Sequence, residues 1–202
     1  MHCCQSCDSQ VAMEPRDGHA VCPECGRVDS AAAIRPLFIV TGASCSGKTA
    51  VLDPLTRRLA GRCVTFDVDW LLDAVGTLSG DQPINWPAFR DAWLAVAHGV
   101  AQSGMPTVLL GPLIPAHLET LPGRRWIADI HFLTLDCPDE LRRARINARP
   151  RWRKRDIDEQ VEFGRWLRDN IADRVDTSSG TPEDTAARVV AWIDRHLTGG
   201  QR

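Results

Sequence analysis

The sequence predicts an α/β protein, a three-layer sandwich with a parallel five-stranded sheet, preceded by a small cysteine-rich module. Two observations carry this prediction. From residue 37 onward, short apolar segments rich in β-branched residues alternate with helix-length segments, as a parallel sheet requires. Five of the eight cysteines, by contrast, lie within the first 25 residues. We therefore expect two parts of the chain with different tasks.

The composition is that of a globular protein, with room for one α/β domain and something small. The chain has 202 residues, of which 44% are hydrophobic and 25% are charged. Its net charge of −2 creates no overall attraction to nucleic acid or anionic membranes. No apolar run approaches the ~20 residues of a membrane span, and the first residues lack the basic start and apolar stretch of a signal peptide. We expect a cytoplasmic protein without a membrane partner.

Two C-x-x-C pairs define the cysteine-rich module, residues 1–30. Cys4 and Cys7 form the first pair, and Cys22 and Cys25 form the second. Each pair can place two thiolates on one tight turn, and together they offer the four sulfur ligands that tetrahedral Zn²⁺ prefers. The pattern resembles a zinc ribbon with a short hairpin between the pairs. Because so small a module buries little core, a structural Zn²⁺ would supply much of its folding free energy.

Alternatives remain for this module. Cys3 competes with Cys4 as a ligand, and His2 or His19 could substitute for a cysteine. A disulfide pair is less favoured in a cytosolic setting, and a redox C-x-x-C is less favoured because no βαβ pattern surrounds it. Residues 31–36, small residues and a proline, are expected to form a linker. A ribbon of this kind could serve stability, a homodimer or a protein partner.

The segment 37–49 is an apolar strand followed by a glycine-rich turn with the pattern G-x-x-x-x-G-K-T. In this phosphate-binding P-loop, successive backbone N–H groups point at phosphate oxygens, and glycine permits the close approach. Lys48 can reach the β- and γ-phosphates, and the Thr49 hydroxyl can ligate Mg²⁺. The complete pattern between a strand and a helix argues against an ordinary turn. The predicted phosphate-binding residues are Gly42, Ala43, Ser44, Cys45, Ser46, Gly47, Lys48 and Thr49.

A second short strand, 63–66, ends in two carboxylates two residues apart, Asp67 and Asp69. In open α/β sheets ligands bind at the carboxyl ends of the strands. The pair is therefore well placed to meet Mg²⁺ and an acceptor group. The alternative is a solvated turn or a helix cap.

The remaining elements follow in order along the chain. Helices are expected over 48–60, from Asn85 to Gly104, and over 138–149, 156–171 and 182–197; strands are expected over 106–110, 130–135 and 174–176. The helix after Asn85 carries Trp86, Phe89, Trp93, Val96 and Val100 at helical spacing. Core packing explains this stripe, although an aromatic edge could face a substrate. Arg90 and His98 on the same helix are surface or satisfied polar residues, or else they contact a ligand.

The densest charge in the sequence lies between Arg142 and Arg155, where eight of fourteen residues are Arg or Lys and none is acidic. A run of this kind is usually a solvated face or an RNA-binding patch. Its expected position at the carboxyl edge of the sheet, opposite the P-loop, instead favours recognition of phosphate.

From residue 37 to 197 these pieces resemble the P-loop small-molecule kinases, which include adenylate, shikimate and nucleoside kinases. The resemblance rests on the P-loop, on Asp67-Val-Asp69, on Pro138-Asp-Glu-Leu141 followed by two arginines, and on Asp176-Thr-Ser-Ser-Gly-Thr-Pro182. It implies a P-loop NTPase fold. It also implies ATP and Mg²⁺ as cofactors.

The resemblance assigns roles on the nucleotide side. Arg145 would stack on adenine, and Arg149 would reach the transferred phosphates. A lid around 149–156, with Arg151, Arg153 and Arg155, would close over them. The turn at 176–182, with Thr177 and Thr181, would meet the adenine edge.

On the acceptor side, the resemblance implies that Asp67 holds Mg²⁺ through water and that Asp69 contacts the acceptor hydroxyl. The Gly-x-Pro-Arg motif that binds the acceptor's phosphate in nucleoside monophosphate kinases is replaced by Gly111-Pro-Leu-Ile-Pro115, which favours a neutral hydroxyl. The guanine-recognition motif N-K-x-D is absent, which favours ATP over GTP.

The sequence thus predicts an ATP- and Mg²⁺-dependent phosphotransferase that acts on a small hydroxyl-bearing molecule, with a nucleoside or nucleotide favoured. Phosphoryl transfer needs mainly positioning and charge neutralisation, which Lys48, Arg145, Arg149 and Mg²⁺ would supply. The alternative is a nucleic-acid-associated NTPase or polynucleotide kinase, in which the zinc ribbon and the basic run bind RNA or DNA.

Overall fold

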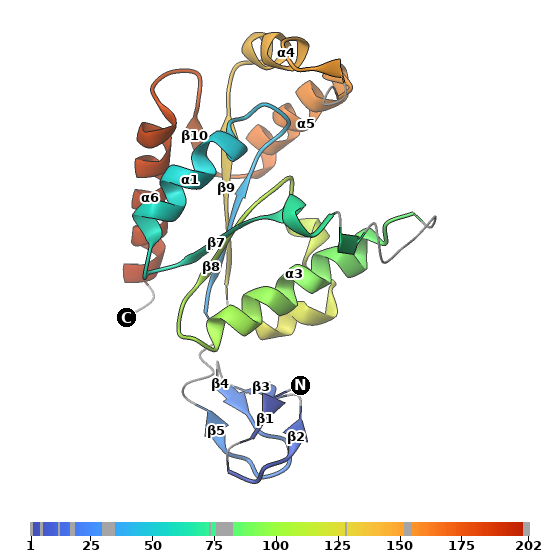
Figure 1. Cartoon of the computed structure of the whole chain (residues 1–202), viewed down its shortest axis with the longest axis vertical. Helices are drawn as coiled ribbons and strands as arrows, with labels where there is room; N and C mark the ends of the chain where they lie inside the picture. Colours follow the sequence, from blue (N-terminus) through green and yellow to red (C-terminus); the bar gives the residue numbers. More distant parts are fainter. Residues whose placement is uncertain are drawn as a thin grey trace.

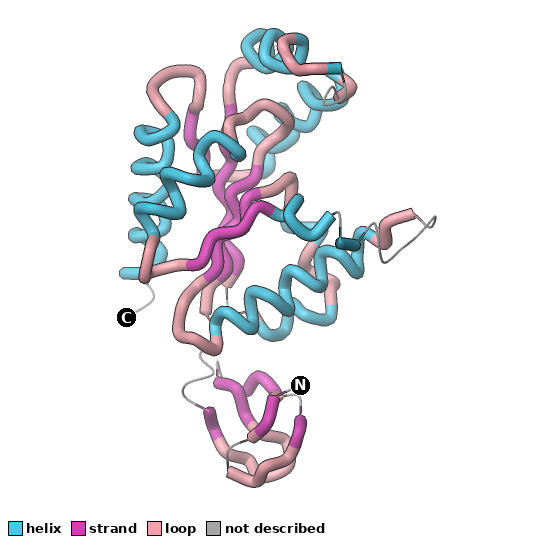
Figure 2. Tube along the Cα trace, viewed as in Figure 1, coloured by secondary structure: helices cyan, strands magenta, loops and turns pink. Residues whose placement is uncertain are grey.

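The centre of the computed structural model is a parallel sheet of five strands between two layers of helices (Figures 1 and 2). The strands are β6 (Leu37–Thr41), β7 (Val64–Asp67), β8 (Thr107–Leu110), β9 (Ile130–Asp136) and β10 (Asp173–Asp176). Their order is β10-β9-β6-β8-β7, and every neighbouring pair is parallel. The predicted fold class is therefore confirmed.

The structure describes most of the chain. The described residues are 2–4, 6–11, 13–16, 19–29, 35–72, 74–75, 83–127, 129–151 and 155–199. Most of the predicted linker and the middle of the predicted lid, with Arg153, lie outside them. The domain boundaries drawn from the sequence accordingly stay a prediction. Among the described residues, no helix is long and apolar enough to cross a membrane.

Two apolar clusters hold the layers together, one on each face of the sheet. Helices α1 (Lys48–Leu59) and α6 (Pro182–Gly199) cover one face, and α3 (Trp86–Ala101) covers the other (Figure 1). Along β6, Phe38 and Val40 join the first cluster, whereas Leu37 and Ile39 join the second. Successive side chains of a strand point to opposite faces, so this central strand is apolar throughout because both faces are buried.

The remaining helices and turns lie between these elements. They are η1 (Val68–Leu71), η2 (Pro115–His117), η3 (Pro122–Trp126), α4 (Asp139–Asn147) and α5 (Ile157–Asn170). Helix α4 follows the end of β9 directly and packs against α5, so both helices stand at the carboxyl end of the sheet (Figure 1).

The cysteine-rich module consists of two small antiparallel sheets. Strands β1 (His2–Cys3) and β2 (Gln10–Val11) pair in one, and β3 (Glu14–Arg16), β4 (His19–Val21) and β5 (Val28–Asp29) form the other. The expected hairpin is the β3–β4 pair. Buried Cys4, Met13 and Cys22 form the small core, and Trp126 of η3 packs against it. The module therefore contacts the α/β part at a defined place.

Candidate active site

The loop between β6 and α1 has the backbone conformation that its glycines predict. A Cβ on Gly42 would lie 2.3 Å from Ser46 Oγ and 2.7 Å from the backbone oxygen of Leu135. Gly47, with φ of 99°, is in the left-handed region that glycine enters without strain. Cys45 adopts φ of 64°, a conformation that costs energy for a residue with a side chain and that clusters at functional sites.

Lys48 lies against the carbonyl oxygens of the same loop. Its Nζ donates hydrogen bonds to Gly42 O at 2.5 Å and to Ala43 O at 3.1 Å. Burial lowers the pKa of Lys48 to about 8, against the opposite effect of Asp67 and then Asp69. The ammonium therefore stands in a poorly solvated place, where a phosphate would be a strong partner.

A cavity of about 1030 Å³ opens above this loop. Residues that the sequence predicted for the site line its wall: Gly42, Ser44, Cys45, Ser46, Gly47, Lys48, Thr49, Asp69, Arg145, Arg149, Arg155, Thr177 and Thr181. Four segments of the sequence thus meet at one place. Three predicted residues, Ala43, Asp67 and Arg151, are not among the described residues that line it.

Arg145 ties α4 to both the P-loop and the turn after β10. Its guanidinium donates to the carbonyl of Thr177 at 2.8 Å and to that of Cys45 at 3.3 Å. The Thr177 hydroxyl in turn lies within hydrogen-bond distance of the carbonyls of Ser46, at 3.0 Å, and Asp136, at 2.9 Å, and can donate its single proton to either. This set of contacts places the predicted adenine-binding turn beside the P-loop.

The two carboxylates after β7 have different surroundings. Asp67 Oδ1 accepts a hydrogen bond from the backbone N–H of Asp69 at 3.0 Å and so caps η1. Asp69 lines the cavity. The helix-cap reading of the D-x-D pair therefore holds for Asp67, and its role toward Mg²⁺ stays a prediction.

No family model matches this sequence, and no curated protein matches it at a significant level. Several solved structures do share its architecture. They include a sugar kinase from Janibacter sp. HTCC2649, 20% identical over 79% of this chain and 94% of its own, with a TM-score of 0.56. The tunicamycin resistance protein of Deinococcus radiodurans is 20% identical over 79% and 95%, with a TM-score of 0.55. Shikimate kinase from Aquifex aeolicus is 17% identical over 82% and 99%, with a TM-score of 0.53.

The chain has the P-loop kinase fold. At these sequence identities the likeness establishes the fold alone. Any function must therefore be argued from the side chains that line the cavity of this chain. Within this fold the cavity lies where the strands end, as expected for an open α/β sheet.

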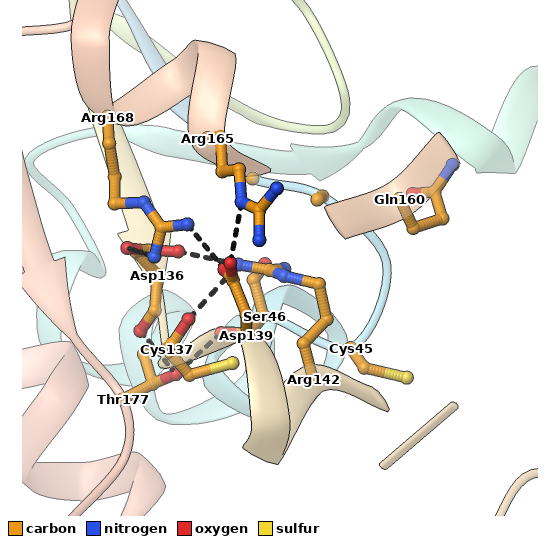
Figure 3. Close-up of polar contacts among 12 residues, drawn as sticks. Cys45, Ser46, Asp136, Cys137, Asp139, Arg142, Gln160, Arg165, Arg168 and Thr177 are labelled. Carbon is orange, nitrogen blue, oxygen red and sulfur yellow. Dashed lines mark hydrogen bonds and ion pairs between the residues drawn. The ribbon is translucent and has the colours of Figure 1, made fainter. Parts of the chain in front are cut away.

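One cluster of polar contacts beside the P-loop was missed in the sequence (Figure 3). Arg142 is fully buried and forms an ion pair with Asp136 at 2.5 Å. Its second guanidinium nitrogen donates to the carbonyl of Ser44 in the P-loop at 3.2 Å. Gly164 of α5 leaves room for it, because a Cβ there would lie 2.9 Å from Arg142 Nη2. The sequence feature that could have indicated this ion pair is Asp136, an aspartate at the end of the apolar strand β9.

Helices α4 and α5 are joined by further ion pairs beside this one (Figure 3). Asp139 accepts from Arg165 Nε at 2.7 Å and from Arg168, and Arg168 also reaches Asp136 at 3.5 Å. These contacts fix the C-terminal half of α5 on the start of α4.

The opposite wall of the cavity is formed by the beginning of α3. Trp86 and Phe89, which fit a core stripe in the sequence, both line the cavity and make an edge-to-face contact at 5.7 Å. Arg90 lines it too, forms no hydrogen bond or ion pair with any described residue, and has a pKa lowered by burial. His98, about two turns further along α3 than Arg90, instead contacts the ring of Trp126 in a tilted arrangement, with the ring centroids 5.0 Å apart.

Most of the described residues of the basic run point into the fold or into the cavity. Arg142 is buried, Arg143 pairs with Asp158 at 2.7 Å, and Arg145, Arg149 and Arg155 line the cavity, whereas Arg151 is exposed. This arrangement fits recognition of phosphate in a cavity better than a solvated surface for RNA.

The four cysteines of the two C-x-x-C pairs come together in the N-terminal module. Their Sγ atoms all lie within 4.8 Å of one another, with Cys4 and Cys25 at 3.7 Å and Cys7 and Cys22 at 3.8 Å. A tetrahedral zinc site with Zn–S bonds of ~2.3 Å separates its sulfurs by roughly 3.8 Å. The distances exceed the ~2.05 Å of a disulfide bond, so the described cysteines fit a metal site. The side chain of Cys3 lies outside the described part.

Proposed function

We propose that the protein is an ATP- and Mg²⁺-dependent kinase of a small hydroxyl-bearing molecule. The observation that supports this best is the two-sided cavity. Its nucleotide side is formed by the P-loop, Arg145 and Thr177, and its other side presents the carboxylate of Asp69. A nucleotide and an acceptor can therefore meet in one cavity, and such positioning is a main requirement of phosphoryl transfer.

In the proposed reaction the acceptor oxygen forms a bond to the γ-phosphorus while the bond to the β,γ-bridging oxygen breaks, and ADP leaves. Asp69 takes the proton of the acceptor hydroxyl. Lys48, Arg145 and Arg149 neutralise the negative charge that spreads over the phosphate oxygens.

Mg²⁺ prefers hard oxygen ligands such as hydroxyl and carboxylate groups. The hydroxyl of Thr49 and the carboxylate of Asp67 would hold the ion, directly or through water. Bound Mg²⁺ would supply further neutralisation of phosphate charge. In the N-terminal module, Cys4, Cys7, Cys22 and Cys25 would hold one structural Zn²⁺.

The acceptor side supports a nucleoside or nucleotide. Exposed Trp86 offers an aromatic face to a planar ring, with buried Phe89 packed edge-to-face against it, and the guanidinium of Arg90 can pair with an anionic group. Arg90 thus supplies, from α3, a cation that the segment after β8 lacks. The missing Gly-x-Pro-Arg motif had argued against an acceptor that carries a phosphate. Because Arg90 can supply the missing positive charge, such an acceptor is again a candidate.

An ATP-consumption screen tests the proposal, with nucleosides, nucleotides, sugars, hydroxy acids and antibiotics as acceptors. We expect Mg²⁺-dependent turnover with at least one acceptor, and loss of it in Lys48→Ala with an unchanged circular dichroism spectrum. Such phosphate clamps are worth orders of magnitude in rate. A variant that keeps more than about a tenth of the turnover would contradict the role of Lys48.

A further inference from the structure

The N-terminal module contacts the α/β part through Trp126, the last residue of η3. The ring of Trp126 packs on the module's core of Cys4, Met13 and Cys22. Residues 1–30 include five acidic residues and two arginines, so the module lacks the positive charge that draws a protein to nucleic acid. Its contact with η3 indicates a role within the molecule instead.

The same turn holds helix α3 at two points. Near the start of η3, the backbone N–H of Gly123 donates a hydrogen bond to Asp91 Oδ1 at 2.7 Å. The approach is close, because a Cβ on Gly123 would lie 3.0 Å from the Cβ of Leu94. At the end of η3, the ring of Trp126 contacts that of His98. Trp126 thus contacts the module and α3 at once.

Helix α3 runs from the cavity toward the module (Figure 1). Its first turns carry Trp86 and Arg90, which line the acceptor side of the cavity, and Asp91 directly follows Arg90. The core of α3 belongs to the cluster on one face of the sheet, together with Ile127 next to η3. Helices α1 and α6, which border the nucleotide side, belong to the cluster on the opposite face. A shift of η3 would therefore move the acceptor wall and leave the P-loop in place.

We propose that Trp126 is a positioning residue: docked on the N-terminal module, it holds η3 against α3 and so sets the affinity of the site for the acceptor but not for ATP. This inference rests on the proposed kinase function. Rigid secondary elements can carry such a coupling between distant places. Loss of the ring leaves a gap between the module's core and α3, to which close-packed elements respond by shifting.

Acceptor kinetics and ATP binding of the full chain test this with two variants that disturb η3 in different ways. Trp126→Ala removes the ring, and Gly123→Ala adds a Cβ 2.8 Å from Asp91 Oδ1, which pushes η3 away from α3. With the acceptor found in the ATP-consumption screen, we expect the acceptor KM to rise about fivefold or more in both variants. The Kd of ATP, from isothermal titration with Mg²⁺, should stay within about twofold. A general loss of structure would weaken both.

Val28→Ala is the matched control, because Val28 is exposed on β5 of the module and is not among the residues packed on its core; neither constant should change. Trp126→Phe keeps an aromatic ring and should stay close to the wild type. Hydrogen exchange gives a readout that needs no acceptor. In both disturbing variants the amides of the first half of α3 should exchange faster, while those of β6 stay protected.

The outcomes separate this inference from the proposed function. If Trp126→Ala does not fold, Gly123→Ala decides alone. An unchanged acceptor KM, or a loss of ATP affinity equal to the loss for the acceptor, overturns the inference while the proposed function stands. Exchange of α3 equal to that of the wild type overturns it even before an acceptor is known. If the wild type phosphorylates no acceptor in the screen, the proposed function fails and the acceptor role of Trp126 fails with it.

Discussion

At the scale of single residues, Asp67 and Asp69 show how two identical side chains come to have different surroundings. Asp67 caps η1, whereas Asp69 lines the cavity, and both carboxylates partly offset the lowering of the Lys48 pKa by burial. A continuous strand would put the two side chains on the same side. Instead β7 ends at Asp67 and Asp69 lies within η1, which gives the two carboxylates different surroundings.

Substitution of each aspartate by asparagine should separate the two roles. Asp69→Asn should lower turnover about 10²-fold or more while ATP binding is nearly unchanged, the usual scale for loss of a positioned base. Asp67→Asn keeps an oxygen that can cap η1, so the fold should survive and the Mg²⁺ concentration needed for turnover should rise. Steady-state kinetics at several Mg²⁺ concentrations measure both. Normal turnover by both variants at low Mg²⁺ would place the acceptor site elsewhere.

Lys48 should make the stability of the protein depend on pH. Its pKa is about 8 in the fold against 10.5 ordinarily, because burial disfavours the charged form. Below pH 8 the proton is bound in both the folded and the unfolded states, so the folded state bears the full free-energy cost of burying the charged ammonium. Between about pH 8 and 10.5 the folded state releases the proton first, so the unfolding free energy rises with pH.

Urea unfolding of the wild type and Lys48→Met at pH 7 and pH 9.5 measures this contribution. We expect the unfolding free energy of the wild type to increase relative to the variant at the higher pH, whatever their difference at pH 7. Other titrating groups are common to both proteins and cancel. A difference that is the same at both pH values would show that Lys48 has an ordinary pKa.

At the scale of elements, the buried pair of Asp136 and Arg142 joins β9, α4 and the P-loop. Arg142→Met would leave Asp136 as a buried charge with only the longer contact to Arg168. Breaking such a pair costs about 3–5 kcal/mol, whereas replacing both partners by apolar residues is often neutral. We expect Arg142→Met to be strongly destabilising and Arg142→Met with Asp136→Leu to recover part of the loss. Denaturant unfolding measures both variants. If Arg142→Met lowers the unfolding free energy by less than about 1 kcal/mol, the ion pair does not stabilise the fold as a buried pair.

At the scale of the whole molecule, the N-terminal module should depend on its metal and the α/β part should not. Among its described residues the module has four buried apolar or sulfur side chains, Cys4, Met13, Val21 and Cys22, and its core contacts the rest of the protein through Trp126. Purified protein should contain one equivalent of zinc, and a chelator should expose the amides of 2–29 to hydrogen exchange while those of β6 stay protected. Less than about half an equivalent of zinc, with oxidised thiols, would contradict the zinc site.

Much of this architecture was predictable from the sequence by itself, for a physical reason. The P-loop, the C-x-x-C pairs and the apolar strands are contiguous patterns, because a tight phosphate turn, a metal knuckle or a buried strand imposes its requirements on neighbouring residues. The parallel sheet followed from strands that alternate with helices. The order β10-β9-β6-β8-β7 and the positions of α4 and α5 then depend on how those elements pack.

Only the tertiary structure decided what surrounds the loop. Ser44 is bound by Arg142 and Gln160, which lie 98 and 116 residues away, and no local pattern announces such contacts. Phe89 joins the core as its helical spacing predicts and also borders the cavity, whereas Trp86 of the same stripe is exposed and Arg90 fits a solvated face, yet both line the cavity. Spacing along a helix specifies which residues share a face. Whether that face meets a core, water or a ligand depends on what the rest of the chain places against it.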